Sequence, residues 1–223
     1  MKAIRRLLPI VAVAIAATLY LAPIASAYEW KVEGKALAAN ETVKTTNEDP
    51  ATKKTVPFLI SGTVVGVPVT IECKVMSTQG EVIVPLVVIG VIIVWGVCAS
   101  RAESEKVKCK VSETIKTTEL KGEVTAIGGR NYVKLKPSSG TTIARITFDP
   151  ECALGEEVVL SGEICGKGET TGVELVTQPL TYSTESATTC KTSLSLGGKT
   201  ASLTGSSWST LSGKNIGKKW GAS

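Results

Sequence analysis

Alternation of apolar and polar residues is the dominant pattern along this chain. Within residues 67–75, Val69, Ile71 and Cys73 fall on one side and the positions between them are polar. A period of two residues predicts a half-buried β-strand. Further strand candidates, rich in Val, Ile and Thr, are residues 28–32, 56–64, 106–111, 114–120, 123–127, 132–136, 141–148, 157–165, 173–182, 192–196 and 201–211.

Turn-forming residues separate these segments, for example Gly128-Gly129 and Gly197-Gly198. No convincing amphipathic helix follows residue 27, and residues 38–54 and 183–189 are expected to be loops. Short strands with glycine-rich turns predict an all-β fold, an antiparallel β-sandwich or barrel of about 10–12 strands.

A long uncharged segment, residues 82–100, interrupts this pattern. Its 19 positions satisfy the length criterion for a membrane-spanning helix. However, 11 of the 17 residues from 82 to 98 are Val or Ile, and Pro85 and Gly90 interrupt the run. β-Branching favours strands over a helix.

We therefore expect two buried strands, residues 81–88 and 91–98, that turn near Ile89-Gly90. Two alternatives remain for this segment. Residues 82–99 form a membrane span or anchor, or one apolar face stays uncovered and mediates self-association.

The first 27 residues predict export. Lys2, Arg5 and Arg6 precede an apolar run over residues 7–21, and Ala25-Ser26-Ala27 supplies a small-x-small cleavage site. This is the pattern of a secretory signal peptide, expected to be helical. Residues 28–223 are then a single β-rich domain, with a subdivision near residues 127–131 as the alternative.

The positive net charge of the chain becomes smaller when the first 27 residues are left out of the count. The chain carries 25 Lys and Arg against 20 Asp and Glu, and three of the basic residues lie in the first 27. The remaining balance of 22 to 20 lacks the strong basic footprint of a nucleic-acid partner.

Positive charge is concentrated locally at the C-terminal end. Residues 191–223 hold five Lys and no carboxylate. The run predicts either a solvated face or contact with an anionic surface through Lys214, Lys218 and Lys219, such as a cell-envelope polymer or lipid headgroups.

An even number of cysteines suits an exported chain. With no C-x-x-C spacing and no histidine in the sequence, three disulfides are favoured over a zinc site. Cys98 with Cys109 is the one local pair we expect, because residues 101–106 indicate a hairpin loop between them. The candidates are Cys73, Cys98, Cys109, Cys152, Cys165 and Cys190.

Missing residue types restrict the chemistry further. Without histidine, Ser-His-Asp and Cys-His catalysis and histidine metal ligands are excluded. Asp49 and Asp149, the two aspartates, both precede proline, which suits turns. No phosphate-binding loop is present. We expect no enzyme activity, cofactor or metal, and a hydrolase that uses a Glu pair on glycans is the remaining catalytic alternative.

Exposed aromatic side chains would suggest sugar binding, because sugars stack on Trp and Tyr. Trp95 lies in the apolar segment and is expected in the core. Trp30, Trp208 and Trp220 are candidates for exposure, although a strand Trp is more often packed.

Residues 30–35, 197–205, 211–220 and the strand at 67–73 resemble uncharacterised secreted β-rich proteins of soil actinobacteria. The resemblance implies no activity and no site residues.

The sequence therefore predicts a secreted or cell-surface, non-catalytic module with a structural, adhesive or ligand-binding role. Its expected partners are a cell-envelope polymer or another surface protein. The alternatives are a membrane-attached envelope protein anchored through residues 82–99 and the histidine-free glycan hydrolase.

Overall fold

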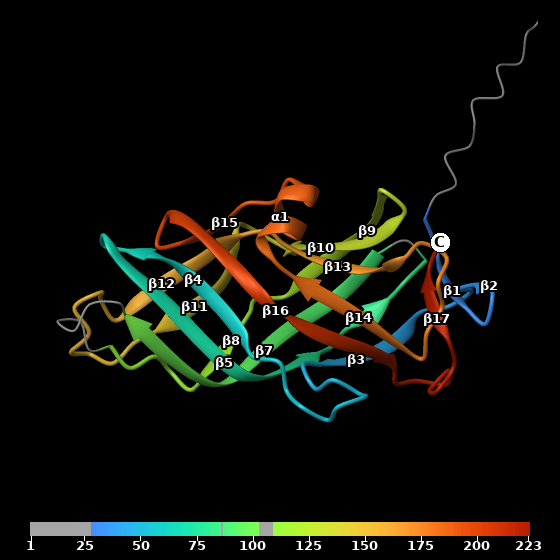
Figure 1. Ribbon diagram of the computed structural model, residues 1–223, viewed down its shortest axis with the longest axis horizontal. Coiled ribbons are helices and arrows are strands. Elements are labelled where there is room, and N and C mark those ends of the chain that lie inside the picture. Colours follow the sequence, from blue (N-terminus) through green and yellow to red (C-terminus); the bar gives the residue numbers. More distant parts are fainter. Residues whose placement is uncertain (1–27, 86, 103–108) are drawn as a thin grey trace, which may run out of the picture.

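The computed structural model describes residues 28–85, 87–102 and 109–223, which form strands and one short helix (Figure 1). The predicted signal peptide lies outside the described residues. The elements are β1 (Trp30–Val32), β2 (Lys35–Ala36), β3 (Glu41–Thr46), β4 (Phe58–Val64), β5 (Val67–Gln79), β6 (Val82–Ile83), β7 (Val87–Ala102), β8 (Thr114–Lys116), β9 (Leu120–Ile127), β10 (Arg130–Pro137), β11 (Thr142–Thr147), β12 (Glu157–Gly162), β13 (Ile164–Thr170), β14 (Thr177–Tyr182), α1 (Thr184–Cys190), β15 (Leu194–Leu196), β16 (Lys199–Leu211) and β17 (Trp220–Ala222).

All the strand pairs are antiparallel, which confirms the predicted all-β antiparallel fold. The described residues hold seventeen strands, more than the predicted number. Part of the difference comes from strands of two residues, such as β2 and β6, which are too short to show a period in the sequence. Another part comes from β3, which lies in an expected loop.

Fourteen strands form one large sheet, and β16 closes it. One edge of β16 pairs with β14 and β15, and the other edge pairs with β3 and β4. From β16, the pairings run through β4, β5, β7, β9, β10, β13 and β14 and return to β16. The sheet is therefore ring-like but not a barrel, because β16 has extra partners in β3 and β15. Of the expected sandwich or barrel, the structure supports only the antiparallel all-β class.

Gly205 allows β16 to close the ring. Inward-facing residues of β16 alternate, and Leu203, Ser207 and Leu211 are buried. Gly205 lies on the same face with φ of 150°, and a Cβ there would sit 2.8 Å from the Phe58 ring. The missing side chain thus provides the space that Phe58 fills.

The uncharged segment forms sheet, as expected, but its turn lies elsewhere. Val84 and Val87 exchange backbone hydrogen bonds of 2.9 and 3.3 Å, so the turn links β6 to β7. The predicted turn at Ile89-Gly90 is wrong, because β7 continues through it. Gly90 is needed instead for close approach, since a Cβ there would lie 2.6 Å from the Gly80 carbonyl oxygen.

Only one face of β7 is fully covered. Val91, Ile93 and Trp95 are buried, whereas Ile92 and Val94, which face the other side, are only partly buried. The expectation of strands buried on both faces is therefore wrong for β7. Among the described residues, no helix has the length and apolar character needed to cross a bilayer.

Two expected loops contain regular structure. Residues 38–54 include β3, whose polar outward positions conceal a buried inward face at Val43 and Thr45. Residues 183–189 lie almost entirely in α1. The strand expected at residues 106–111 and the loop at 101–106 fall mainly outside the described residues.

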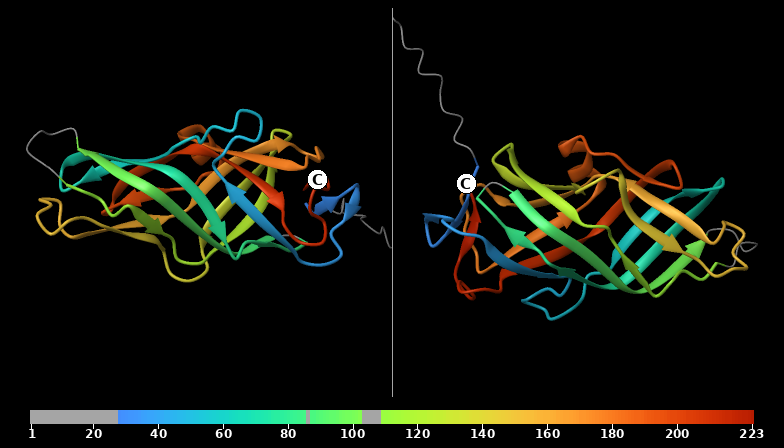
Figure 2. Two further views of the ribbon diagram at one scale, coloured as in Figure 1. Left: turned by 90° about the horizontal axis from the view of Figure 1, so that it is seen from below. Right: turned by 180° about the vertical axis from the view of Figure 1, so that it is seen from behind.

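The second sheet joins the two ends of the described chain. β1 pairs with both β2 and β17, and Figure 2 shows this sheet at one end of the molecule, beside the C-terminus. Trp30 and Trp220 pack there with ring centroids 5.3 Å apart.

Replacing Gly205 with Ala tests the closure. We expect Gly205→Ala to lower the free energy of unfolding by about 1–3 kcal/mol, because the new methyl group collides with Phe58. Urea denaturation measures this change. Gly96→Ala in β7 is the control, since its Cβ would meet nothing closer than 3.9 Å. Equal stability of the two variants would contradict the role of Gly205.

Candidate functional site

The six cysteines form three disulfides, Cys73–Cys98, Cys109–Cys152 and Cys165–Cys190, which confirms the predicted framework. The expected pair of Cys98 with Cys109 is wrong. Cys98 lies directly opposite Cys73 in the β5–β7 register, so a partner 25 residues away is the nearer one in space.

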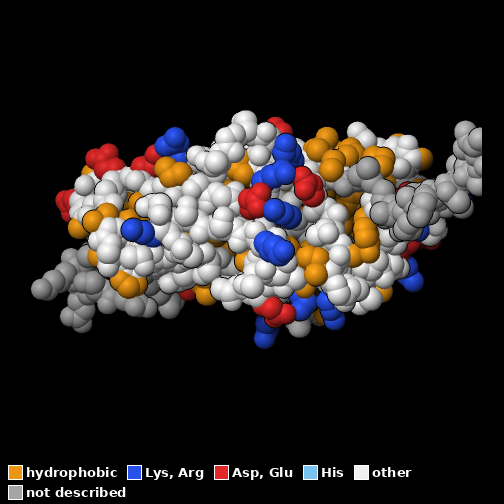
Figure 3. All heavy atoms as spheres, turned by 90° about the horizontal axis from the view of Figure 1, so that it is seen from above, with side chains coloured by type: hydrophobic (Ala, Val, Ile, Leu, Met, Phe, Trp, Pro, Cys, Tyr) orange, Lys and Arg blue, Asp and Glu red, His pale blue; other side chains and the backbone are white. Residues whose placement is uncertain are grey.

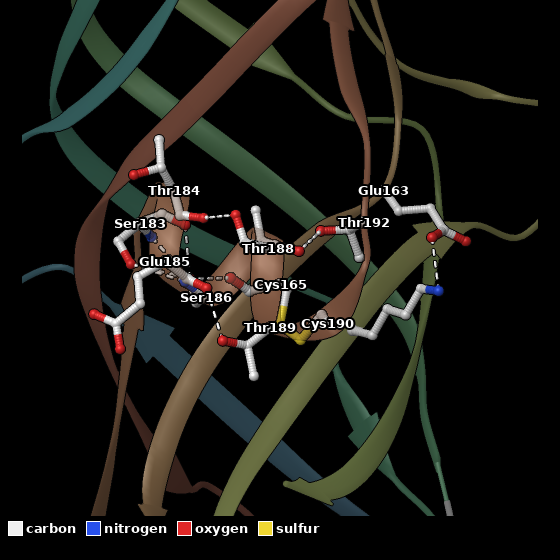
Figure 4. The surroundings of a disulfide bond; sticks show 12 residues. Glu163, Cys165, Ser183, Thr184, Glu185, Ser186, Thr188, Thr189, Cys190 and Thr192 are labelled. Carbon is white, nitrogen blue, oxygen red and sulfur yellow. Dashed lines mark hydrogen bonds and ion pairs between the residues drawn. A yellow bond between two sulfur atoms is a disulfide. The ribbon is translucent and has the colours of Figure 1, made fainter.

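Cys165 anchors α1 at two points (Figure 4). Its sulfur bonds Cys190, the last residue of the helix, and its carbonyl oxygen accepts a 3.0 Å hydrogen bond from Ser186 Oγ. Ser186 is fully buried, so the helix is fixed against β13 at both ends. Closing a loop of 25 residues stabilises the fold by about 3.5 kcal/mol in the chain-entropy account.

The ends of α1 are capped within the chain. The Ser186 backbone N–H donates to Ser183 Oγ at 3.1 Å, and the Ser183 N–H donates to Ser186 Oγ at 2.9 Å. At the other end, Lys191 adopts φ of 54° and its N–H returns to Thr188 O. A helix of seven residues is too short to persist alone, so caps and disulfide together hold it in place.

A pocket of about 280 Å³ lies between α1 and the sheet. Its apolar lining comes from Ile164, Tyr182, Ala187, Leu194, Ala201 and Leu203. Hydroxyl groups line the remainder, from Ser183, Thr184, Thr188, Thr192, Ser193, Thr200 and Ser202. Both walls are rigid, because α1 is anchored to β13 and the opposite wall is the β15–β16 pair.

Charge is nearly absent from this pocket. Its one ionisable carboxyl, Glu163, is paired with Lys134 at 2.7 Å, and no Lys or Arg belongs to the described lining. The face that carries α1 is mostly uncharged, with acidic and basic side chains intermixed in a central group (Figure 3). Such a pocket suits a neutral molecule with an apolar side and several hydrogen-bonding groups.

Hydroxyl groups also form a cluster inside the ring, around Glu81. Glu81 Oε2 accepts hydrogen bonds from Thr45 Oγ1 at 2.6 Å and Thr78 Oγ1 at 2.7 Å. Thr45 Oγ1 lies 2.7 Å from Ser209 Oγ, on β16. Burial raises the pKa of Glu81, and the two threonine hydrogen bonds oppose that shift. Burial also raises the pKa of Tyr182 to about 12.

A small cavity of about 40 Å³ adjoins this cluster. Glu81, Ser209, Trp30 and Trp220 contribute to its lining, and neither indole N–H has a hydrogen-bond partner within the described protein. The space is sufficient for about three water molecules.

Glu81 makes stability depend on pH. A raised pKa means that the folded protein holds this proton more tightly than the unfolded chain, so stability falls as pH rises from 4.5 towards the folded pKa. We expect Glu81→Gln to raise the Tm by about 2–4 °C near neutral pH, and less at low pH. Thermal unfolding across pH measures this, with exposed Glu113→Gln as the control. A Tm difference that does not change with pH would refute the assignment.

The predicted basic contact residues share one loop. Lys214, Lys218 and Lys219 are all exposed between β16 and β17. Lys214 Nζ lies 3.5 Å from the buried Glu41 carboxylate, and Lys218 Nζ donates to Asn215 Oδ1. Contact of this loop with an anionic surface stays a prediction.

Of the four tryptophans, one remains partly exposed. Trp30, Trp95 and Trp220 are buried. Trp30 and Trp220 are therefore not the exposed side chains for which they were candidates. Trp208 lies on the outer face of β16 and is half-buried. The sequence could not separate these cases, because burial depends on which face of a strand meets the core.

Metal ligands do not gather in the described part of the chain, where no three acidic or cysteine side chains cluster. Comparison of the sequence with protein-family models and curated proteins, and of the fold with solved structures, gives no match. The resemblance to secreted actinobacterial proteins stays a prediction.

Proposed function

We propose that the protein is an exported, non-catalytic binding module that holds a small neutral ligand in the pocket beside α1. The observation that carries this proposal is the pocket itself, about 280 Å³ in volume with apolar and hydroxyl lining. Binding sites of this kind bury the apolar side of a ligand and orient it with a few polar groups.

Rigidity of the pocket supports binding. A wall that is already ordered costs little conformational entropy when a ligand enters, so more of the contact energy appears as affinity. Cys165 orders α1 through a disulfide and a buried hydrogen bond, and both constraints persist without a ligand. The pocket is thus organised for an occupant before one arrives.

An extracellular location accords with the same features. Disulfides form and persist in oxidising compartments, and the described residues contain three. The signal-like residues 1–27 point the same way.

The two alternatives have less support. Anchoring through residues 82–99 competes with the sheet, because β6 and β7 supply strands to the ring. A glycan hydrolase needs two carboxyl groups across an open site. The pocket beside α1 offers Glu163 alone, and Lys134 neutralises it.

Blocking the pocket tests the proposal. In Ala187→Leu, a larger side chain on α1 projects into the pocket, whereas Thr189→Leu places the same side chain on the helix outside the pocket lining. We expect saturation-transfer NMR on a set of neutral sugars and small alcohols to detect ligands for the wild type and Thr189→Leu. Ala187→Leu should weaken binding about tenfold or more.

Two results would overturn the proposal. One is the absence of any neutral ligand at millimolar concentration. The other is a ligand whose affinity is the same for Ala187→Leu and the wild type. Circular dichroism and Tm of each variant show whether the fold is retained.

A further inference from the structure

A second hollow, separate from the α1 pocket, lies on the outer face of the sheet around Trp208. Its volume is about 280 Å³, and it extends over β16, β3 and β14. These three strands lie side by side at the front of the molecule, and the loop after β3 hangs below them (Figure 1). The α1 pocket shares no lining residue with it.

Strand register explains the layout of this groove. Trp208 is flanked by Thr46 on β3 and by Pro179 on β14. Two residues further along β16, Thr210 is flanked in the same way by Lys44 and Thr177. Since alternate residues share a face, Trp208 and Thr210 point outward together, opposite the buried Ser207 and Ser209.

The loop after β3 forms the rim of the groove and is held in a fixed shape. Asp49 Oδ1 accepts a hydrogen bond from the Ala51 N–H at 2.8 Å, and the Lys53 N–H donates to Asp49 O at 2.8 Å. This turn brings Lys53 and Glu48 to the groove. The aspartate is thus used within the loop and is not part of the lining.

The groove has an excess of positive charge. Lys44 and Lys53 contribute to its lining against one carboxylate, Glu48. No ion pair found within the described residues includes Lys44 or Lys53. Lys53 also lies close enough to Asp49 to help the Ala51 N–H lower the pKa of that carboxyl, but neither ammonium group is held in an ion pair in the described part of the chain, so both can bind a further negatively charged group.

We propose that this groove binds a segment of an acidic polysaccharide whose sugars carry carboxylates. A sugar ring packs its apolar face on the Trp208 indole, since an aromatic ring offers an apolar face with a polar edge. A uronate carboxylate lies between Lys44 and Lys53, and Thr46 and Thr210 supply hydroxyls to the sugar.

The probe for this site is a tetramer of galacturonic acid, with maltotetraose as the neutral match. Isothermal titration calorimetry should show that the wild type binds the acidic tetramer at least about tenfold more tightly than the neutral one. Raising NaCl from about 50 to about 500 mM should remove most of that preference, because exposed charges are screened.

Substitutions at Trp208 and at the two lysines separate the contributions of the aromatic ring and of the positive charges to the affinity. Trp208→Thr should lower affinity for the acidic tetramer about tenfold or more, and Trp208→Phe should restore most of it, because the ring is retained. Lys44→Gln with Lys53→Gln should reduce affinity to the level of maltotetraose. Lys116→Gln with Lys199→Gln, a control pair of exposed lysines outside the groove, should change nothing.

Ala187→Leu distinguishes binding in the groove from binding in the α1 pocket, because it blocks the pocket and leaves the groove intact. The proposal that the groove binds an acidic polysaccharide is contradicted if the wild type fails to bind the acidic tetramer at millimolar concentration. It is also contradicted if Lys44→Gln with Lys53→Gln leaves the affinity unchanged. If Trp208→Thr fails to fold, the affinity of the Lys44→Gln, Lys53→Gln variant and the salt dependence of wild-type binding still test the proposal. Loss of binding in Ala187→Leu alone would assign the acidic tetramer to the pocket and overturn the proposal.

Discussion

Closure of the large sheet by β16 is the constraint on which the rest of this structure depends. One strand near the end of the chain pairs with β14 and β15 on one edge and with β3 and β4 on the other. The close packing of Gly205 on Phe58 makes this closure compatible with a filled interior. Because β3 and β4 come from the first third of the chain, the closing contacts are among the most distant in sequence and carry a large entropic cost.

Both candidate sites take their shape from that strand. The α1 helix connects β14 to β15, which are neighbours on one edge of β16, so closure fixes where the helix crosses. The outer face of β16 presents Trp208, and its inner face carries Ser209 to the hydroxyl cluster at Glu81. The three disulfides restrict the unfolded chain and so offset part of the entropy that closure costs.

The periodicity of the sequence was sufficient to predict most of the strands, but not which strands pair with one another. The alternation in residues 67–75 predicted β5 correctly, and an even cysteine count predicted the disulfides. The partner of Cys98 followed from strand register, which local spacing does not contain. The α1 helix was missed because its order comes from a cap, a buried serine and a disulfide rather than from an amphipathic repeat. Gly90 suggested a turn, although its role is close contact with Gly80. The α1 pocket was missed together with the helix that forms one of its walls. The groove was harder still to predict, because it combines residues 44–53 with residues 177–210.

Hydrogen exchange of the backbone amides tests the closure most directly. If β16 holds the ring together, the amides of residues 199–211 that pair with β3, β4 and β14 should exchange only through global unfolding. Their exchange free energies should then match the denaturant-derived free energy of unfolding, and the amides of β3 and β4 should show the same value. Exchange of β16 at much lower free energy than β5 and β7 would contradict the account, since the ring would then persist without its closing strand.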